Sequence, residues 1–318
     1  MEVRSIAEHM NGGNDKVTAK NANKRAGRPR RRVVVVAFDG VEPIDVSGPS
    51  SVFGRANLLR PGTYEVVHAA VGGTSVGTGS GLTLSDLVPI ELMQGAIDTL
   101  LVAGGDEAGL RRVIFDDEFP VWIRERAARI RRIGSVCTGA FVLAATGLLD
   151  GRRAVTHWAS CDLLAQLAPK VRVDANAIYV VDPPFYTSAG VTAGIDLSLA
   201  MVEEDLGRKV AAQIARDMVL FLRRSGGQQQ YSAALAGQQE STTFGDLLTW
   251  IIENPTADLR VPALAERAGM TERTFLRAFG REAGSTPAAF VRRARVECAQ
   301  RLLETRDLPL KTIAQEAG

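Results

Sequence analysis

Cysteine is scarce and long apolar runs are missing in this chain of 318 residues. Its three cysteines, Cys137, Cys161 and Cys298, are odd in number and far apart, which argues against a disulfide framework. They favour a reducing compartment, so we expect a cytoplasmic protein. No stretch approaches about eighteen apolar residues, which excludes a membrane-spanning helix, and residues 1–20 lack the apolar core of a signal peptide. The net charge of +2 is too small to indicate a partner.

The length favours two domains, and the apolar pattern changes character between them. Residues 33–38 form a β-branched run without alternation, typical of a strand buried on both faces. Further strands and helices alternate after it, which predicts an α/β domain over residues 32–224 with a doubly wound, mainly parallel, flavodoxin-like sheet. The expected strands are 64–71, 97–102, 133–136, 153–158, 171–173, 177–181 and 185–188, and the expected helices are 43–59, 107–114, 118–131, 159–167, 192–206 and 208–223. A hairpin connection is expected in residues 72–81.

Two stretches outside these elements have the composition of unfolded chain. Residues 1–31 are polar and non-periodic, which predicts a disordered basic arm. Six basic residues between Lys24 and Arg32 resemble a minor-groove AT-hook, although a solvated basic tail explains them more simply. Residues 225–242 are rich in Gly and Gln and predict a flexible linker.

The stretch around Cys137 carries the strongest local signal. A short apolar strand, Ile133 to Val136, runs directly into a helical pattern, and the residues around Cys137 are all small. A tight strand-to-helix turn needs small neighbours, as in the nucleophile elbow of hydrolases. The adjacent helix N-terminus would favour a thiolate. The simpler alternative is a buried free cysteine without a role.

Residues 243–318 contain no strand pattern and predict an all-α domain. Val261 to Phe279 has the pattern of a helix-turn-helix, in which Gly269 supplies a left-handed turn and Thr271 caps the second helix. We expect Thr271, Arg273, Leu276 and Arg277 to contact DNA, because a recognition helix needs an exposed, Arg-bearing side.

Both regions resemble known families. Residues 270–303 resemble the signature of AraC/XylS-type transcription regulators, whose two helix-turn-helix units are joined by a long helix, here implied over residues 287–304. Residues 308–318 match the first helix of a second unit and the next helix is absent, so we expect a fragment or a truncated domain. Residues 35–53, 103–105, 135–140, 156–158 and 187–190 resemble the DJ-1/PfpI superfamily. The combination is that of GlxA-like regulators.

The resemblance implies a ligand pocket formed by Asp45, Gly104, Gly105, Cys137, Thr138 and His157. We expect backbone N–H donors from Gly105 and Thr138 on one side and the Asp45 carboxylate opposite, which suits a small zwitterion. Thr138 stands where peptidase-like relatives carry the catalytic histidine. Isocyanide hydratases of the superfamily combine a Cys-Thr pair with an Asp in the context found at residues 44–49. His157 is either a partner of Cys137 or a structural histidine.

The sequence therefore predicts a transcription regulator whose first domain senses a small metabolite, such as a zwitterionic amine or an amino-acid-like compound, without catalysing a reaction. It is expected to bind DNA, to form a homodimer through the first domain, and to use no cofactor or metal. The alternatives are a cysteine-dependent hydratase or amidase, and a dimerisation module with an empty pocket. The effector, the operator, and activation as against repression are open.

Overall fold

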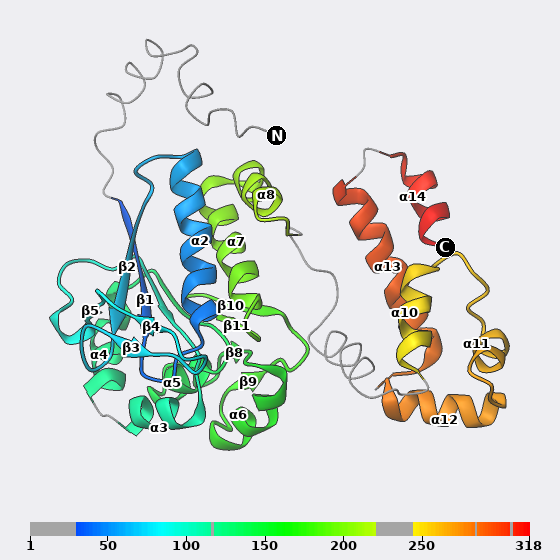
Figure 1. Ribbon diagram of the computed structural model, residues 1–318, viewed down its shortest axis with the longest axis horizontal. Helices are drawn as coiled ribbons and strands as arrows, with labels where there is room; N and C mark the ends of the chain where they lie inside the picture. The colour runs from blue at the N-terminus through cyan, green and yellow to red at the C-terminus, as the bar shows by residue number, and fades with distance from the viewer. Residues whose placement is uncertain (1–29, 116–117, 221–243, 284, 306–307) are drawn as a thin grey trace, which may run out of the picture.

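The computed structural model describes residues 30–115, 118–220, 244–283, 285–305 and 308–318 (Figure 1). Within these residues, every strand lies before residue 189 and the part after residue 244 is helical. The division into an α/β region followed by an all-α region agrees with the sequence prediction. The arm over residues 1–29 and the linker over residues 225–242 lie outside the described residues. None of the described helices has the length and hydropathy needed to cross a membrane.

The α/β domain is built on a seven-stranded sheet. Its strand order is β10-β11-β7-β6-β1-β2-β5, in which only β10 runs antiparallel to its neighbour. The strands are β1 (Arg31–Ala37), β2 (Tyr64–Ala70), β5 (Val88–Pro89), β6 (Thr99–Val102), β7 (Arg132–Ser135), β10 (Tyr179–Asp182) and β11 (Phe185–Ser188). The central order β2-β1-β6-β7-β11 is the flavodoxin-like one, so the predicted doubly wound sheet is confirmed.

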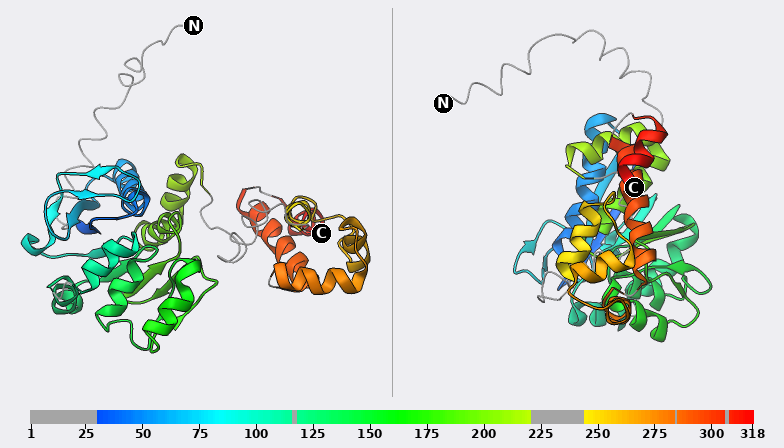
Figure 2. Two further views of the ribbon diagram at one scale, coloured as in Figure 1. Left: turned by 60° about the horizontal axis from the view of Figure 1, so that its bottom comes forward. Right: turned by 90° about the vertical axis from the view of Figure 1, so that its right-hand side faces the viewer.

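Strand β1 shows why the sheet is covered on both faces. Val33, Val35 and Ala37 join one apolar cluster and Val34 and Val36 join the other, all of them buried. The first cluster is completed by helices α2 (Pro43–Leu59), α7 (Ala193–Leu206) and α8 (Arg208–Asp217). The second is completed by α3 (Glu107–Phe115), α4 (Glu118–Arg126) and α5 (Gly139–Ala145). Figure 2 shows the two groups of helices on either side of the strands. A strand buried on both faces needs no polar alternation, as its sequence indicated.

Smaller elements lie at the edges of the sheet, and several are shorter than predicted. The hairpin expected near residues 72–81 is present as β3 (Val76–Gly77) paired with β4 (Thr83–Leu84). The strand expected over 153–158 is only β8 (Arg153–Ala154), which pairs with β9 (Arg172–Val173). The helix expected to Arg131 ends at Arg126 and continues as a 3₁₀ turn, η2 (Ala127–Arg129). Further short elements are η1 (Ile90–Leu92), η3 (Trp158–Ser160) and α6 (Cys161–Leu167).

The amino end of the sheet is closed by a buried ion-pair cluster. Arg132, at the start of β7, is 2 % exposed and donates to Asp205 (2.9 Å) and Glu204 (2.6 Å) at the end of α7. Asp205 also accepts hydrogen bonds from Arg131 (3.1 Å) and from the hydroxyl of Tyr64 (2.9 Å). A buried charge is tolerated only when it is paired in this way. The cluster therefore fixes α7 against the beginnings of β2 and β7.

The first domain begins one residue earlier than predicted. Arg31 and Arg32 belong to β1, although their charges placed them in or beside the basic arm. Arg32 pairs with Glu65 at 3.0 Å, and Arg31 lies 3.8 Å from Asp205. These two arginines of the basic run are thus part of the folded domain, with partners that are distant in the sequence.

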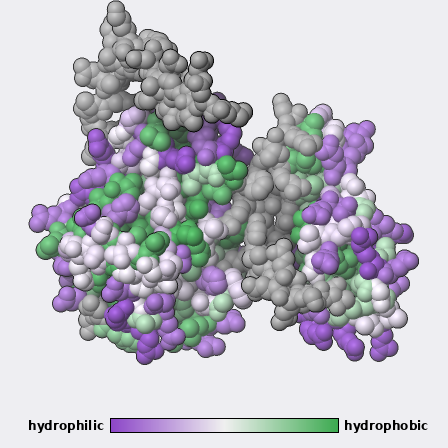
Figure 3. Space-filling view, viewed as in Figure 1, coloured by the Kyte–Doolittle hydropathy of each residue, from purple (hydrophilic) through white to green (hydrophobic). Residues whose placement is uncertain are grey.

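The second domain consists of α10 (Gly245–Glu253), α11 (Val261–Arg267), α12 (Glu272–Glu282), α13 (Pro287–Thr305) and α14 (Leu310–Ala317). Its core is a group of stacked rings in which Phe244 contacts Phe275 and Phe279, and Phe279 contacts Phe290. These phenylalanines come from three separate segments, so the rings hold α12 and α13 to the start of α10. The space-filling view shows many hydrophilic residues along the outer rim of this domain (Figure 3).

Candidate functional site

Cys137 lies on a sharp turn between β7 and α5. Its φ angle is +54°, a strained conformation for a residue that has a side chain. The N–H of Cys137 donates to the carbonyls of Ser188 (3.1 Å) and Ala189 (3.0 Å), at the end of β11. Gly139 lies so close to the carbonyl of Val102 that a Cβ would not fit. The strand-to-helix turn predicted from the small residues around Cys137 is confirmed.

Asp45, Gly104, Gly105 and Thr138 are brought together by the ends of three neighbouring strands. Asp45 follows β1, the two glycines follow β6, and Thr138 follows β7. The N–H of Gly104 donates to Oδ2 of Asp45 (2.9 Å), and the N–H of Gly105 donates to Oγ1 of Thr138 (3.0 Å). A Cβ on Gly104 would lie only 2.7 Å from Oγ1 of Thr138, so a larger residue would force the loops apart. These parallel strands end at the sheet edge where open α/β folds bind ligands.

This geometry corrects the expected division into donors and an opposing carboxylate. The N–H of Gly105 is already bonded to Thr138, and the N–H of Thr138 faces the sulfur of Cys137. Asp45 is bonded to Gly104 instead of facing it across a pocket. The two predicted N–H donors are therefore engaged by side chains of the protein. These contacts could not be predicted from the sequence, because the partners come from loops far apart in the chain.

Asp45 is fully buried, with one oxygen left unbonded. Oδ1 of Asp45 has no hydrogen-bond partner in the described part of the chain. Burial raises the pKa of Asp45 to about 7, the Gly104 N–H opposes the shift, and the nearby charge of Glu42 adds to it. Glu42 is placed there because its side chain caps α2 by accepting from the N–H of Ile44 (3.2 Å). An unbonded carboxyl oxygen in a buried site is a place for a hydrogen-bonding or charged ligand.

Cys137 is held as a thiol. It is 8 % exposed, and burial together with the charge of Asp45 raises the pKa of its thiol to about 12. Hydrogen bonds from Thr138 and from the N–H of Val191 lower the pKa by less than these two effects raise it. The expectation of a depressed thiol pKa at the helix start is therefore wrong. The short helix α5 offers too little to offset the loss of water and a neighbouring carboxyl.

His157 lies beside the same loop but is not bonded to Cys137. Its Nδ1 accepts from the N–H of Ala159 (3.4 Å), and its ring packs on Trp158 with centroids 5.4 Å apart. A Cβ on Gly190 would lie 2.7 Å from the ring, so the imidazole packs directly against Gly190. The next residue in that loop, Val191, donates its N–H to the sulfur of Cys137. Partial burial lowers the pKa of His157. Among the described residues, its hydrogen bonds and ring contacts do not include Cys137.

Some residues that shape the site were not recognised from the sequence. Thr156 donates from Oγ1 to the carbonyl of Cys137 (2.9 Å), which ties the turn to the loop before His157. Val191 supplies an N–H to the sulfur of Cys137, and Glu42 supplies a nearby charge to Asp45. The segments 156–158 and 187–190 carry the family resemblance together with the segment that contains Cys137. This shared resemblance was the signal in the sequence that could have led to Thr156 and to Val191, which follows the second segment.

The helix-turn-helix has the predicted geometry. Gly269 has a φ angle of +66°, and Oγ1 of Thr271 accepts from the N–H of Thr274 (3.4 Å) at the start of α12. Phe275 and Phe279 are buried in the core. Thr271, Arg273, Leu276 and Arg277 are exposed, as a DNA-contacting side requires.

The structure separates the arginines of the second domain by their contacts. Arg267 stacks on the ring of Trp250 at 3.7 Å, Arg293 donates to Ser285 (3.1 Å), and Arg295 donates to the carbonyl of Pro255 (2.9 Å). These contacts hold the three side chains in place, although Arg267 stays exposed. Arg273, Arg277 and Arg292 are exposed.

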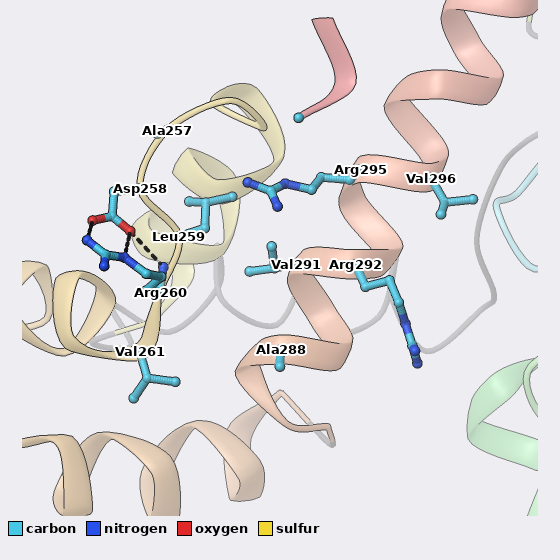
Figure 4. A pocket seen from close by; sticks show the side chains of 11 residues that line it. Ala257, Asp258, Leu259, Arg260, Val261, Ala288, Val291, Arg292, Arg295 and Val296 are labelled. Atoms are coloured by element: carbon cyan, nitrogen blue, oxygen red, sulfur yellow. Dashed lines mark hydrogen bonds and ion pairs between the residues drawn. The ribbon is translucent and has the colours of Figure 1, made fainter. Parts of the chain in front are cut away.

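A hollow of about 630 Å³ lies between residues 257–261 and the first half of α13 (Figure 4). Leu259, Val261 and Val291 give it an apolar lining, and Arg260 on its wall is paired with Asp258. None of the four residues predicted to contact DNA lines it. The hollow is thus separate from the exposed side of α12.

An α/β domain with a buried polar site, combined with a helix-turn-helix domain, is the architecture of a DNA-binding regulator that carries a second domain of α/β fold. Residues 31–204 match the DJ-1/PfpI family, and residues 264–318 match a helix-turn-helix domain. The chain belongs to the DJ-1/PfpI family and carries an AraC-type helix-turn-helix domain, which makes it a DNA-binding transcription regulator.

Individual relatives and a solved structure are similar to this chain to different extents. The chain is 32 % identical over 272 residues to the HTH-type transcriptional regulator GlxA of Rhizobium meliloti, covering 83 % of this chain and 81 % of the relative. It is 36 % identical over 170 residues to an isonitrile hydratase of Pseudomonas putida, covering 54 % and 70 %. The crystal structure of an AraC family transcriptional regulator from Pseudomonas putida superposes with a TM-score of 0.54 at 22 % identity, covering 59 % of this chain and 99 % of that one.

Proposed function

We propose that the first domain of this regulator senses a small metabolite with an amine or amino-acid-like group, bound against Asp45 and beside Cys137 and Thr138. The observation that carries the proposal is the unbonded Oδ1 of Asp45, buried at the ligand-binding edge of the sheet. A ligand ammonium group would supply both the missing hydrogen bond and an opposite charge. Such a ligand would return the pKa of Asp45 towards its ordinary value.

The anionic end of a zwitterion is less well specified. The N–H groups of Gly104, Gly105 and Thr138 are engaged within the protein. A carboxylate would have to displace one of these bonds or lie nearer the half-buried ring of His157. The site therefore selects for the cationic group, and we expect simple amines to bind as well as amino acids do.

We further propose that Cys137 contacts the effector without attacking it. A thiol with a pKa near 12 holds little thiolate at neutral pH, and no hydrogen bond joins it to His157 among the described residues. Thr138 stands where peptidase-like relatives carry their histidine. In this arrangement the thiol and Thr138 line the site.

The alternative function is a cysteine-dependent hydratase. It is favoured by the 36 % identity to an isonitrile hydratase and by the meeting of Asp45, Cys137 and Thr138 at one site. A carboxyl group with a pKa near 7 is also suited to transfer a proton at neutral pH. The two functions differ in whether the ligand is consumed.

Two substitutions and one assay separate these functions. In a transcription reporter driven by a panel of amines, amino acids and betaines, Asp45→Asn should lose most of the response and Cys137→Ser should retain a large part of it. Purified wild-type protein should be stabilised by the active compound and leave its concentration unchanged. If Cys137→Ser abolishes the response and the wild type consumes the compound, the hydratase is correct. If no compound stabilises the protein, the site is a dimerisation module without a ligand.

A further inference from the structure

A second pocket lies at the opposite end of the sheet from Cys137. It has a volume of about 400 Å³ and is formed by the loop that enters β6 and by the turn that enters β7. The first loop contributes Gly95, Ala96 and Ile97, and the second contributes Arg126, Arg129 and Ile130. Both loops precede parallel strands, so the pocket is at the amino edge of the sheet, whereas Cys137 follows β7 at the carboxyl edge. Its size is sufficient for a small metabolite.

The guanidinium group of Arg126 is held in place and yet only weakly neutralised. It lies over the ring of Trp122 at 4.4 Å and donates to the carbonyl of Trp122 (3.4 Å). Its acidic neighbour, Glu125, is 3.7 Å away with a side chain that is 68 % exposed, so solvent screens this pair. The stacked ring fixes the side chain before any ligand arrives, which lowers the entropic cost of binding.

Arg129 and Arg32 add positive charge at the same place. Arg129, on η2, is exposed and has no hydrogen bond or ion pair to another described residue. Arg32 donates from Nη1 to the carbonyl of Gln94 (2.7 Å) and lies against Gly95, where a Cβ would be 2.8 Å from Nη1. Its own charge is balanced by Glu65 at 3.0 Å. Among the described residues, those that line the pocket include no carboxylate, and Arg126 and Arg129 are the charged groups of its wall.

We propose that this pocket binds a small oxyanion, a carboxylate or a phosphate monoester, at a site separate from the one that contains Asp45. Two guanidinium groups on one wall match the paired oxygens of such an anion. Ile97 and Ile130 form an apolar surface for a short carbon body. The ligand would bridge the two loops that lead into β6 and β7.

Trp122 provides the measurement, because its ring lies directly beneath Arg126. The full-length protein is titrated with inorganic phosphate and with succinate at constant ionic strength in chloride, and tryptophan fluorescence is recorded. Trp122→Phe identifies the part of the signal that comes from this ring, since Trp158 and Trp250 lie elsewhere in the chain. Arg126→Gln and Arg129→Gln test the two charges. Arg124→Gln, an exposed arginine of α4 outside the pocket, is the matched control.

We expect saturable changes in fluorescence with phosphate, succinate or both, and we expect Trp122→Phe to abolish them. The affinity for the anion should be weakened about tenfold or more in Arg126→Gln and in Arg129→Gln. Arg124→Gln should behave like the wild type. A general salting-out effect of the anions would change the fluorescence of all variants alike, and this result would overturn the proposal. A fluorescence response to short duplex DNA without a response to the small anions would also overturn the proposal. In that case the arginines would contact the phosphate backbone of DNA.

Discussion

Asp45 and Cys137 are two acids that share one buried site, and they titrate far apart. The carboxyl pKa of about 7 and the thiol pKa of about 12 mean that the first proton to leave comes from Asp45. A second ionisation would place two negative charges in one buried region. The site thus changes charge near neutral pH through its carboxyl group, and the sulfur stays protonated.

The raised pKa of Asp45 predicts a pH-dependent stability. In the folded protein the pKa rises from 3.8 to about 7, so the contribution of Asp45 is fully present below about pH 3.8 and is lost as the pH rises through 7. At pH 8 the ionised carboxyl costs up to about 4 kcal/mol. Asp45→Asn keeps an acceptor for Gly104 and removes the charge. It should raise Tm at pH 8 by at least about 3 °C, with a smaller gain towards pH 4.

Asp182 serves as a control in the same domain, because its pKa is shifted in the direction opposite to that of Asp45. Its pKa is lowered by the N–H of Arg153 and by Arg152, so its stabilising contribution exists at neutral pH and is lost in acid. Asp182→Asn should lower Tm at pH 8, where Asp45→Asn raises it. Calorimetry across this pH range measures both. Equal shifts for the two variants at pH 8 would contradict the assigned pKa of Asp45.

The sequence revealed the position of Cys137 but not its chemistry. The small residues on both sides predicted the turn because they are local to it. The thiol pKa depends on Asp45 and Val191, which are distant in the chain, and on how fully the site is closed. For the same reason the acceptors of the Gly104 and Gly105 N–H groups could not be foreseen.

At the scale of elements, strong periodic patterns predicted helices and strands well and their ends less well. The run in β1 and the pattern from Val261 to Phe279 predicted elements that the structure confirms. The end of α4 at Arg126 was missed, because the following residues turn to enter β7. The stacking of Arg267 on Trp250 was not predicted, because the two residues lie on different helices.

Helix α12 supports a prediction about DNA binding. Arg273, Leu276 and Arg277 are exposed while Phe275 and Phe279 anchor the helix, so removal of one arginine should leave the fold intact. Arg277→Ala should weaken specific binding by about 1–3 kcal/mol, the value of a good base contact. Band-shift titrations of full-length protein at several salt concentrations measure the loss. Lys170→Ala removes an exposed cation of the first domain and should have no effect. Unchanged affinity of Arg277→Ala at every salt concentration would reject the assignment.

At the scale of the whole molecule, the two domains have separate cores. The apolar clusters of the sheet are formed by residues between Val33 and Met218, and the ring cluster of the second domain begins at Phe244. A domain with its own core is able to fold alone. The division was visible in the sequence because strand patterns end before a stretch rich in Gly and Gln.

Two-fold symmetric pairs of regulators suit paired DNA half-sites. The resemblance of the first domain implies a dimer through that domain. We expect residues 31–220 alone to sediment as a dimer at tens of micromolar, and we expect the same of the full-length protein. The self-contained clusters of this domain make the truncated chain a fair test. A monomeric truncated chain beside a dimeric full-length protein would place the interface in the second domain. A monomer in both cases would leave each chain to bind a single DNA site, and the affinity for paired half-sites would then show no cooperativity.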